Sequence, residues 1–398
     1  MKILVLASRF PYPIEKGDKL RLYHQLRVLS RQHEIILCAL HTDPIQAADL
    51  AAVSQYCQTV YLLRQRPVRI AWSLLSSLWG SMPAQTAYFW DPALHRKIQE
   101  IATREQPDHV YCQLIRMAPY IDGLTMSATL DYMDCFSAGL GRNARLAAGW
   151  VRPWLEAEAR KTARYEQLVF QWFGSHTVIS AADRDALPLA EAHTVEVVPN
   201  GIDTAYFRPY PTENQRYDVM FVGNMGYMPN VQAARCLVRE IMPAVWAVRP
   251  DTTVLLAGAR PAPEVVAMQQ DTRVTVSGWV EDIRTAYAAG RILAAPIFSG
   301  SGQQNKILEA LAMGCCCVTT PQVQAGIGAP PAALMVADTP QAFAALILRG
   351  LQDPALRADM RREARSWVEG PHAWEHAAGL LCTLLENTST PTPKNGHT

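Results

Sequence analysis

Lys306 and Glu309, three residues apart, are the residues whose types and spacing most directly suggest chemistry in this chain. They follow a Ser-Gly-Ser-Gly segment, residues 299–302, which joins an apolar run to a helical stretch. Small residues allow backbone N–H groups to approach a phosphate, and a helix N-terminus adds a positive dipole. Lys306 would supply a full positive charge, and Glu309 lies on the same helix face for a ribose hydroxyl. The segment therefore predicts a diphosphate site.

The same spacing has a purely structural interpretation. An ordinary glycine turn can precede a helix, and a Lys-Glu pair can lie on its exposed face. From spacing alone the two interpretations stand about equal, so the elements that would position Lys306 have to be considered.

Two series of short apolar runs alternate with amphipathic stretches, which is the pattern of βα units around a parallel sheet. The first series comprises residues 3–7, 34–40, 60–63, 109–114, 129–134 and 177–180. The second comprises residues 217–223, 253–258, 274–278, 292–297 and 315–320. We therefore predict an α/β protein with two Rossmann-like domains.

The domain boundary is predicted at a Pro-Asn-Gly turn that follows an apolar run. We expect an N-terminal acceptor-side domain over residues 1–198, a linker over 199–215 and a C-terminal donor domain over 216–371. A last helix at about 372–386 could pack back on the first domain. Residues 388–398 have a composition that cannot support a core, so we expect a disordered tail.

Bulk composition excludes several classes of function. The 398 residues carry 37 Lys and Arg against 36 Asp and Glu, so a general positive field for nucleic acid is absent. Nine cysteines without C-x2-C pairs argue against a disulfide framework or a zinc site, and Cys315–Cys317 are expected to pack in a strand. No signal peptide or membrane-spanning segment is predicted, so we expect a cytoplasmic protein.

Four segments in order resemble the group 1 retaining glycosyltransferases of GT-B fold. They are Val-Pro-Asn-Gly-Ile-Asp at 198–203, Phe-Val-Gly at 221–223, Ser-Gly-Trp-Val with Asp282 at 277–282, and Lys-Ile-Leu-Glu-Ala-Leu-Ala-Met-Gly at 306–314. Residues 9–21 and 131–134 resemble, more narrowly, the sugar transferases associated with exosortase (PEP-CTERM) exopolysaccharide systems.

The resemblance implies that two domains face each other across a cleft and that a nucleoside diphosphate sugar binds the C-terminal one. Lys306 then matches the catalytic lysine that contacts the donor diphosphate, and Glu309 matches the glutamate that holds the ribose. The implied donor-binding residues are Gly223, Asn224, Gly300, Ser301, Gly302, Asn305, Lys306 and Glu309. The implied cleft or acceptor-side residues are Gly17, Arg21 and Asp134.

Two departures from the family pattern affect the donor site. The first glutamate of the family's paired-glutamate motif would fall at Ser301, which puts the identity of the sugar in doubt. The basic residue expected after the first donor-domain strand is replaced by Gly-Asn-Met-Gly at 223–226. Lys306 would then act with backbone amides, or with Arg9, Lys16 or Arg21 of the facing domain.

The resemblance also implies retention through same-face attack assisted by the leaving phosphate, with no metal and no cofactor. The sequence Asp183-Arg184-Asp185 imitates a D-x-D metal motif, but it lies at an expected helix start, where acids favour the dipole. His109 and His176 are interpreted as structural. Asp131 and Asp134 end an expected strand, where acceptor positioning and turn capping remain equal alternatives.

Residues 61–79 combine three arginines with a Trp- and Leu-rich stretch. This mixture suits the headgroup boundary of an anionic membrane, but a helix packed on the sheet would also need the apolar residues. The membrane interpretation fits a lipid-linked acceptor, so peripheral contact with the inner face of the cytoplasmic membrane stays open.

The function expected from these observations is sugar transfer from a nucleoside diphosphate sugar to a polysaccharide or lipid-linked glycan in exopolysaccharide biosynthesis. A nucleotide-sugar epimerase and a non-catalytic nucleotide-sugar-binding scaffold are the alternatives, the latter because of Ser301. A dehydrogenase is disfavoured because no G-x-G-x-x-G follows the first strand.

Overall fold

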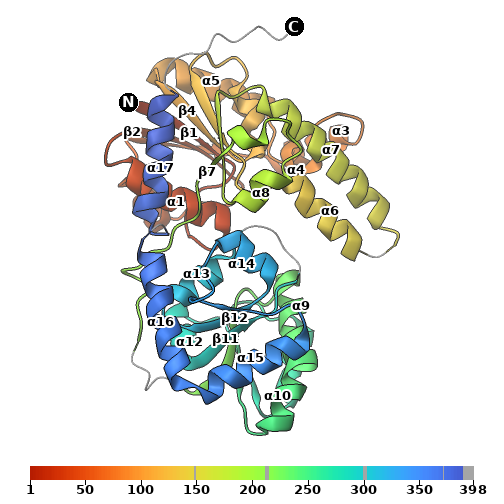
Figure 1. The fold of residues 1–398 in the computed structure, drawn as a ribbon. Helices are drawn as coiled ribbons and strands as arrows, with labels where there is room; N and C mark the ends of the chain where they lie inside the picture. The colour runs from red at the N-terminus through yellow and green to blue at the C-terminus, as the bar shows by residue number, and fades with distance from the viewer. Residues whose placement is uncertain (148, 211–214, 299–302, 371, 389–398) are drawn as a thin grey trace. The chain divides into compact units, whose positions relative to one another are not determined.

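The computed structural model describes residues 1–147, 149–210, 215–298, 303–370 and 372–388 (Figure 1). The chain divides into two compact units. Unit 1 consists of Met1–Gly201 together with Trp374–Thr398, and unit 2 consists of Ile202–Ala373. Apart from Thr388, the tail expected to be disordered lies outside the described residues.

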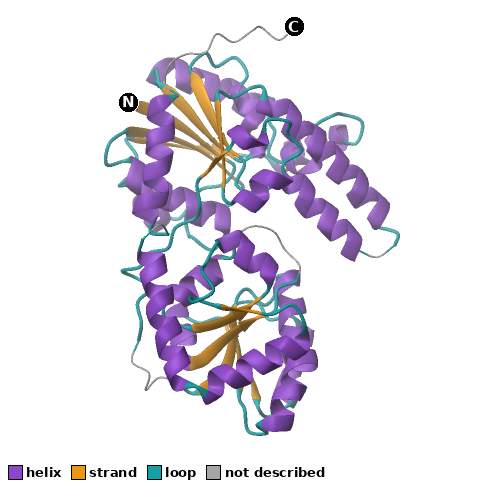
Figure 2. Ribbon diagram, viewed as in Figure 1, coloured by secondary structure: helices purple, strands orange, loops and turns teal. Residues whose placement is uncertain are grey.

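Unit 1 contains a seven-stranded parallel sheet in the order β3-β2-β1-β4-β5-β6-β7 (Figure 2). The strands are β1 (Lys2–Ala7), β2 (Glu34–His41), β3 (Thr59–Arg64), β4 (His109–Gln113), β5 (Ser127–Asp131), β6 (Ser175–Val178) and β7 (Glu196–Val197). Chain order runs outward from β1 in both directions, so the reversal lies between β1 and β4. In open parallel sheets, ligands bind outside the carboxyl ends of the strands at such a reversal.

Helices cover both faces of this sheet, so each face forms a separate core. Successive residues of β1 pack alternately in these two cores. The helices are α1 (Gly17–Leu29), α2 (Ala47–Ser54), α3 (Pro67–Ser77), α4 (Ala84–Ala87), α5 (Pro92–Glu105), η1 (Ile115–Ile121), α6 (Phe136–Leu146), α7 (Arg152–Phe170), α8 (Ala181–Ala186), η2 (Ala192–Thr194) and α17 (Trp374–Asn387). The C-terminal helix α17 packs on α1, with Leu381 and Leu385 in the same core as Leu22 and Leu26. The helix α17, far from α1 in sequence, thus completes a core of unit 1.

Unit 2 contains a six-stranded parallel sheet in the order β10-β9-β8-β11-β12-β13. The strands are β8 (Tyr217–Val222), β9 (Val254–Ala257), β10 (Val274–Gly278), β11 (Gly290–Ala295), β12 (Cys316–Thr319) and β13 (Met335–Val336). The helices are α9 (Met228–Cys236), η4 (Leu237–Ile241), α10 (Met242–Val248), α11 (Pro263–Val266), η5 (Ala267–Gln270), α12 (Ile283–Ala289), α13 (Asn305–Ala312), α14 (Pro321–Ile327), α15 (Pro340–Gln352) and α16 (Pro354–Glu369). Chain order reverses between β8 and β11.

Both sheets have the strand order of a Rossmann-type fold, which confirms the predicted α/β class with two Rossmann-like domains. Their continuous apolar strands follow from burial on both faces. Cys316 and Cys317 lie buried in β12, where burial raises the pKa of both thiols. They act there as small apolar side chains.

Two features are absent from the described parts of the chain. No helix there is long and apolar enough to cross a membrane. No group of three or more His, Cys, Asp or Glu side chains there could hold a metal ion. His109 and His176 are buried and hydrogen-bonded to Thr129 Oγ1 and Phe170 O, and burial lowers the pKa of each to about 4.

Candidate functional site

The candidate donor site lies in unit 2, at the carboxyl ends of β8 and β11. The loop at residues 223–227 connects β8 to α9, and the segment after β11 leads into α13. Because the two strands are parallel neighbours, both loops emerge at the same edge of the sheet. Gly223 and Asn224 lie in the first loop, and Lys306 and Glu309 lie in α13.

The first loop is shaped by close backbone packing. Gly223 N donates to Ala257 O at 2.9 Å, and a Cβ at Gly258 would lie 1.8 Å from Gly223 O. Gly258 also has a φ of +138°, so glycine is required there. Asn224 is exposed, and its Oδ1 accepts from Gly226 N at 3.0 Å. Asn224 therefore shapes the turn that follows β8.

Lys306 is joined to this loop through a residue that no sequence motif indicated. Lys306 Nζ donates to Oδ1 of Asn230 in α9, and it lies 5.5 Å from the centroid of the Phe221 ring. Asn230 Nδ2 in turn donates to Asn224 O at 2.9 Å. Asn230 is only 4% exposed, so it holds the lysine and the loop in fixed positions relative to each other.

Burial dominates the electrostatics of the lysine and the glutamate. Burial lowers the pKa of Lys306 to about 8, while the nearby Glu309 carboxylate opposes this shift. Burial raises the pKa of Glu309, and Lys306 and the hydroxyl of Tyr287 oppose it. Tyr287 OH donates to Glu309 Oε2 at 2.7 Å. Within the described structure Lys306 bonds to a neutral amide rather than to a carboxylate, so its charge is available to an anionic ligand.

Three predicted donor residues, Gly300, Ser301 and Gly302, lie outside the described residues. Asn305 is half-buried and begins α13 directly after Gln304, whose side chain provides no cap for the helix. The positive end of the α13 dipole, which the first N–H groups of the helix form, therefore lies beside Lys306.

Trp279 is a second residue to which sequence reasoning gave no role. It follows Gly278, which has a φ of +68°, at the carboxyl end of β10. Its side chain is 71% exposed. A large exposed aromatic ring at the ligand-binding edge of a parallel sheet can stack on a planar base. In the sequence, only its place in the 277–282 motif could have indicated a role for Trp279 at the donor site.

The acceptor-side residues lie at the corresponding edge of unit 1. Gly17 is exposed at the start of α1, and an added Cβ there would contact nothing within 4 Å. Asp134 follows β5 and is half-buried. Burial and the neighbouring carboxylate of Asp183 raise the pKa of Asp134 to about 7. A carboxyl group held there could accept a hydrogen bond from a sugar hydroxyl.

Arg21 requires a correction, because its side chain is fully enclosed in unit 1. Its Nε donates to Asp131 Oδ2 at 2.7 Å, and its Nη1 donates to Val198 O and Asn200 Oδ1. Asp131 also accepts from the hydroxyl of Tyr111 at 2.8 Å. Arg21 and Asp131 therefore stabilise unit 1 and are not presented to a ligand or to the donor phosphates.

Two of the other charged candidates, Arg9 and Asp183, have local partners. Arg9 Nη1 forms an ion pair with Asp18 Oδ2 at 2.6 Å. In the D-x-D sequence, Asp183 is buried at the start of α8, where its N–H donates to Ser180 Oγ. Lys16 is exposed immediately before α1.

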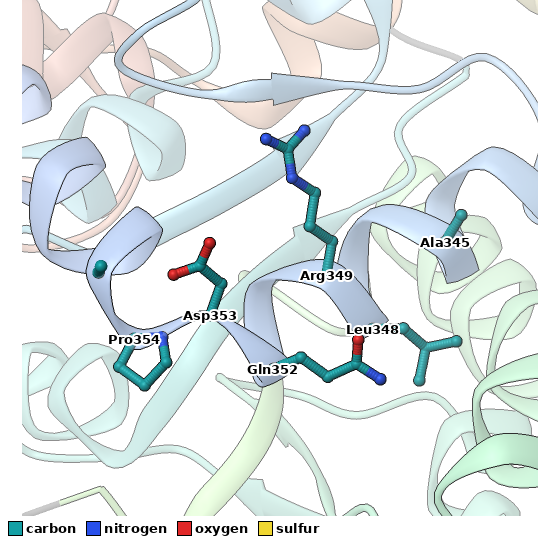
Figure 3. A pocket seen from close by; sticks show the side chains of 7 residues that line it. Ala345, Leu348, Arg349, Gln352, Asp353 and Pro354 are labelled. Carbon is teal, nitrogen blue, oxygen red and sulfur yellow. The ribbon is translucent and has the colours of Figure 1, made fainter.

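Unit 2 also has a surface hollow of about 780 Å³ at the junction of α15 and α16 (Figure 3). Arg349, Gln352 and Asp353 line it together with small and apolar residues. None of the predicted donor residues lines this hollow, so it is separate from the site around Lys306.

Comparison with known proteins indicates the enzyme class to which unit 2 is related. Residues 216–353 match the family model described as glycosyl transferases group 1, which spans β8 to the end of α15 and includes Lys306 and Glu309. The protein is a glycosyltransferase, EC 2.4.

The glycosyltransferase is similar to a distant curated relative and to several solved structures. An uncharacterised 44.6 kDa protein in the cps region of Klebsiella pneumoniae is 21% identical over 330 residues, covering 78% of this chain and 80% of the relative. Sucrose-phosphate synthase from Thermosynechococcus elongatus aligns with a TM-score of 0.72 and 16% identity, over 97% and 99% of the two chains. Anabaena HepE, solved in complex with UDP, aligns with a TM-score of 0.69 and 15% identity, over 97% and 100%. These structures share the GT-B fold with this chain.

Proposed function

We propose that this glycosyltransferase takes its sugar from a nucleoside diphosphate sugar bound around Lys306. The observation that carries the proposal is a half-buried lysine that Asn230 holds at the reversal of the unit 2 sheet. No carboxylate of the described structure neutralises its charge directly. The complex of HepE with UDP supports a nucleotide in this fold.

The chemistry of the step explains why such a lysine is needed. As the bond to the sugar breaks, negative charge grows on the departing diphosphate and positive charge grows at the anomeric carbon. Lys306 and the N–H groups of α13 would stabilise the departing group electrostatically, without a metal. Glu309, oriented by Tyr287, would hold the ribose, and Trp279 would stack on the base. Same-face attack assisted by the leaving phosphate would give retention.

The acceptor that we propose is a growing, lipid-linked polysaccharide of an exopolysaccharide system in the cytoplasm. The resemblance of residues 9–21 and 131–134 to exosortase-associated transferases supports it, as does a relative named for a cps region. On this proposal Asp134 contacts a hydroxyl of the acceptor.

A nucleotide-sugar panel on the purified protein tests the donor site. UDP-, GDP-, ADP- and dTDP-sugars are compared with free nucleotides by thermal shift, since a ligand stabilises the fold in proportion to occupancy. One nucleotide class should raise Tm selectively. Lys306→Ala should abolish that shift and lower transfer by about 100-fold or more, as for the loss of one charge-stabilising donor. Glu309→Ala should weaken nucleotide binding.

Lys97→Ala is the matched control, because Lys97 is exposed on α5 of unit 1. Its nucleotide shift should equal that of the unaltered protein. Equal donor affinity and turnover in Lys306→Ala would remove the site assignment. Formation of an isomeric sugar nucleotide without acceptor would identify an epimerase instead, and binding without transfer or hydrolysis would identify a scaffold.

We also propose peripheral contact between unit 1 and an anionic membrane. Ser77 is the only residue of α3 that the structure buries, so none of the apolar residues of this helix is fully buried against the sheet. Trp72 and Trp79 are 67% and 81% exposed. Trp150 and Trp154 are 87% and 55% exposed on the projecting α6–α7 hairpin (Figure 1). Lys161 of α7 donates to Ser77 O, which links the hairpin to α3.

The charge around these tryptophans suits anionic headgroups. Residues 64–79 carry three arginines and no acid, and residues 137–164 carry six basic residues and two acids, whereas the whole chain has a net charge of +1. Tryptophan at the lipid interface combined with basic side chains is the pattern of peripheral membrane surfaces.

Vesicle sedimentation tests the membrane contact. The full protein should bind vesicles containing phosphatidylglycerol more strongly than phosphatidylcholine vesicles, and added salt should weaken binding. Changing Trp72, Trp79 and Trp150 together to Ser should reduce binding by roughly tenfold or more. Trp279→Ser removes an equally exposed tryptophan from unit 2 and should have no effect. Equal binding by the triple variant would contradict the proposal, and a protein partner would then be the better occupant of this surface.

A further inference from the structure

Arg116 is a half-buried arginine without a hydrogen-bond partner in the described structure. It is the second residue of η1, which follows β4 directly at the reversal of the unit 1 sheet. Its guanidinium carbon lies 5.2 Å from the centroid of the Phe89 ring and 5.0 Å from that of Phe136. Two aromatic rings thus hold the guanidinium, while no acceptor among the described residues bonds to it.

A guanidinium carries five N–H donors in a fixed planar arrangement, and leaving them unpaired away from water is unfavourable. Arg116 Nε is enclosed and has no partner among the described residues. Burial and the charge of Arg9 lower the pKa of Arg116 to about 10, with Asp18 and Asp134 opposing the shift. Even so, the group remains charged at neutral pH.

Arg9 lies near the same Phe89 ring as Arg116, but Arg9 has an anionic partner. Its guanidinium carbon lies 5.6 Å from the Phe89 ring centroid, and its Nη1 is paired with Asp18. Because Asp18 is already bonded to Arg9, Arg116 is the arginine of this pair that still needs an anion. Carboxylates and phosphates both accept paired hydrogen bonds from a guanidinium.

Asp134 supplies the second half of the recognition chemistry. It lies near enough to raise the pKa of Arg116, and its side chain is half-buried. A carboxylate of this kind accepts hydrogen bonds from hydroxyls, whereas Arg116 donates them to an anion. Their proximity therefore suits a molecule that carries both hydroxyls and a negative charge.

We propose that Arg116 binds an oxyanion, either a carboxylate or a phosphate, carried by the sugar acceptor in unit 1. The proposal rests on the proposed sugar transfer and adds the chemical class of the acceptor to it. A neutral sugar would leave the guanidinium unpaired, so Arg116 selects for acidic acceptors. A uronic acid and a phosphate-linked sugar are the two sources of such an oxyanion.

The experiment measures binding of three probes to the full-length protein by calorimetry. The probes are methyl glucuronide, glucose 6-phosphate and neutral methyl glucoside, each titrated with saturating nucleotide present so that phosphate cannot occupy the Lys306 site. At least one anionic probe should bind about tenfold or more tightly than methyl glucoside. Arg116→Gln should remove that preference, and Arg116→Lys should restore only part of it, because ammonium lacks the planar arrangement.

Arg145→Gln is the matched control, since Arg145 is exposed on α6. Preference for glucuronide alone would identify a uronic acid, and preference for the sugar phosphate alone would identify a phosphate-linked acceptor. Equal binding of all three probes, or an unchanged preference in Arg116→Gln, would overturn the proposal. Nucleotide affinity measured in the same variants distinguishes failure of the acceptor proposal from failure of the donor site. If Arg116→Gln does not fold, Arg116→Lys provides the test in its place.

Discussion

At the scale of single residues, Lys306 and Arg116 are both cations held in place by neutral groups. Lys306 bonds to the Asn230 amide beside the Phe221 ring, and Arg116 lies between Phe89 and Phe136. Keeping a buried charge free of a carboxylate is costly for folding. In both units the arrangement leaves the charge available for a ligand at the carboxyl ends of the strands.

The lowered pKa of Lys306 predicts an unusual pH dependence of nucleotide binding. Only the protonated amine attracts a diphosphate, so nucleotide affinity should fall by about fivefold between pH 8 and pH 9. Lys306→Arg should bind with a flat profile over the same range, because arginine stays charged. Calorimetric titration of the preferred nucleotide at pH 7, 8 and 9 checks this. A profile that is flat in the unaltered protein would show that the lysine is not buried as described.

The same shift has a consequence for stability. The folded pKa of about 8 lies below the ordinary lysine value, so the unfolded chain binds more protons between these limits. Protonating Lys306 therefore opposes folding below pH 8, and its unfavourable contribution should diminish as pH rises through this window. Bound diphosphate should reverse the effect by pairing with the charge.

At the scale of elements, the ends of β8 and β9 lie so close that side chains are excluded. Gly258 faces the carbonyl of Gly223, and the Gly223 position itself would place a Cβ 2.9 Å from Asn230 Nδ2. The loop after β8 therefore reaches Asn230, and through it Lys306, by backbone contact. The precision of the lysine position depends on these two strand ends.

Gly258→Ala should destabilise unit 2 by about 2–4 kcal/mol, since it adds both a clash and an unfavourable φ. The folded fraction should also lose nucleotide affinity. Denaturant unfolding of the variant measures the stability change. Gly141→Ala in α6 is the control, because a Cβ there contacts nothing within 4 Å and alanine favours a helix. Equal stability of the two variants would contradict the close approach of β8 and β9.

At the scale of the whole molecule, each unit has its own cores and its own buried anchors. In unit 1 the Arg21–Asp131 ion pair joins α1 to β5, and Arg21 also bonds to Val198 and Asn200 at the end of the unit. In unit 2 the continuous core lies around β8 and β11. Units with separate cores are expected to unfold as separate cooperative transitions.

Arg21→Met should lower the stability of unit 1 by about 3–5 kcal/mol, because it leaves Asp131 buried without its cation. Scanning calorimetry should show one transition moving to lower temperature, while the transition raised by nucleotide stays in place. Arg152→Met is the control, because Arg152 and Glu156 form an exposed pair worth less than about 1 kcal/mol. Movement of both transitions together would contradict independent units.

The alternation of apolar runs was sufficient to predict both Rossmann-like domains, because strands buried on both faces need such runs wherever they lie in the chain. Lys306 and Glu309 could also be chosen from the sequence, since their relation is local to one helix turn. Whether they contact a donor remains a prediction.

Relations between distant segments were decided only by the tertiary structure. Arg21 was expected to face a ligand, but its partner Asp131 is 110 residues away and encloses it. Asn230 meets Lys306 from 76 residues away, and Phe89 and Phe136 meet at Arg116. The exposure of α3 could not be predicted from residues 61–79 alone. Composition and local spacing say which groups a chain carries, but burial and partner choice depend on packing between elements that no local pattern encodes.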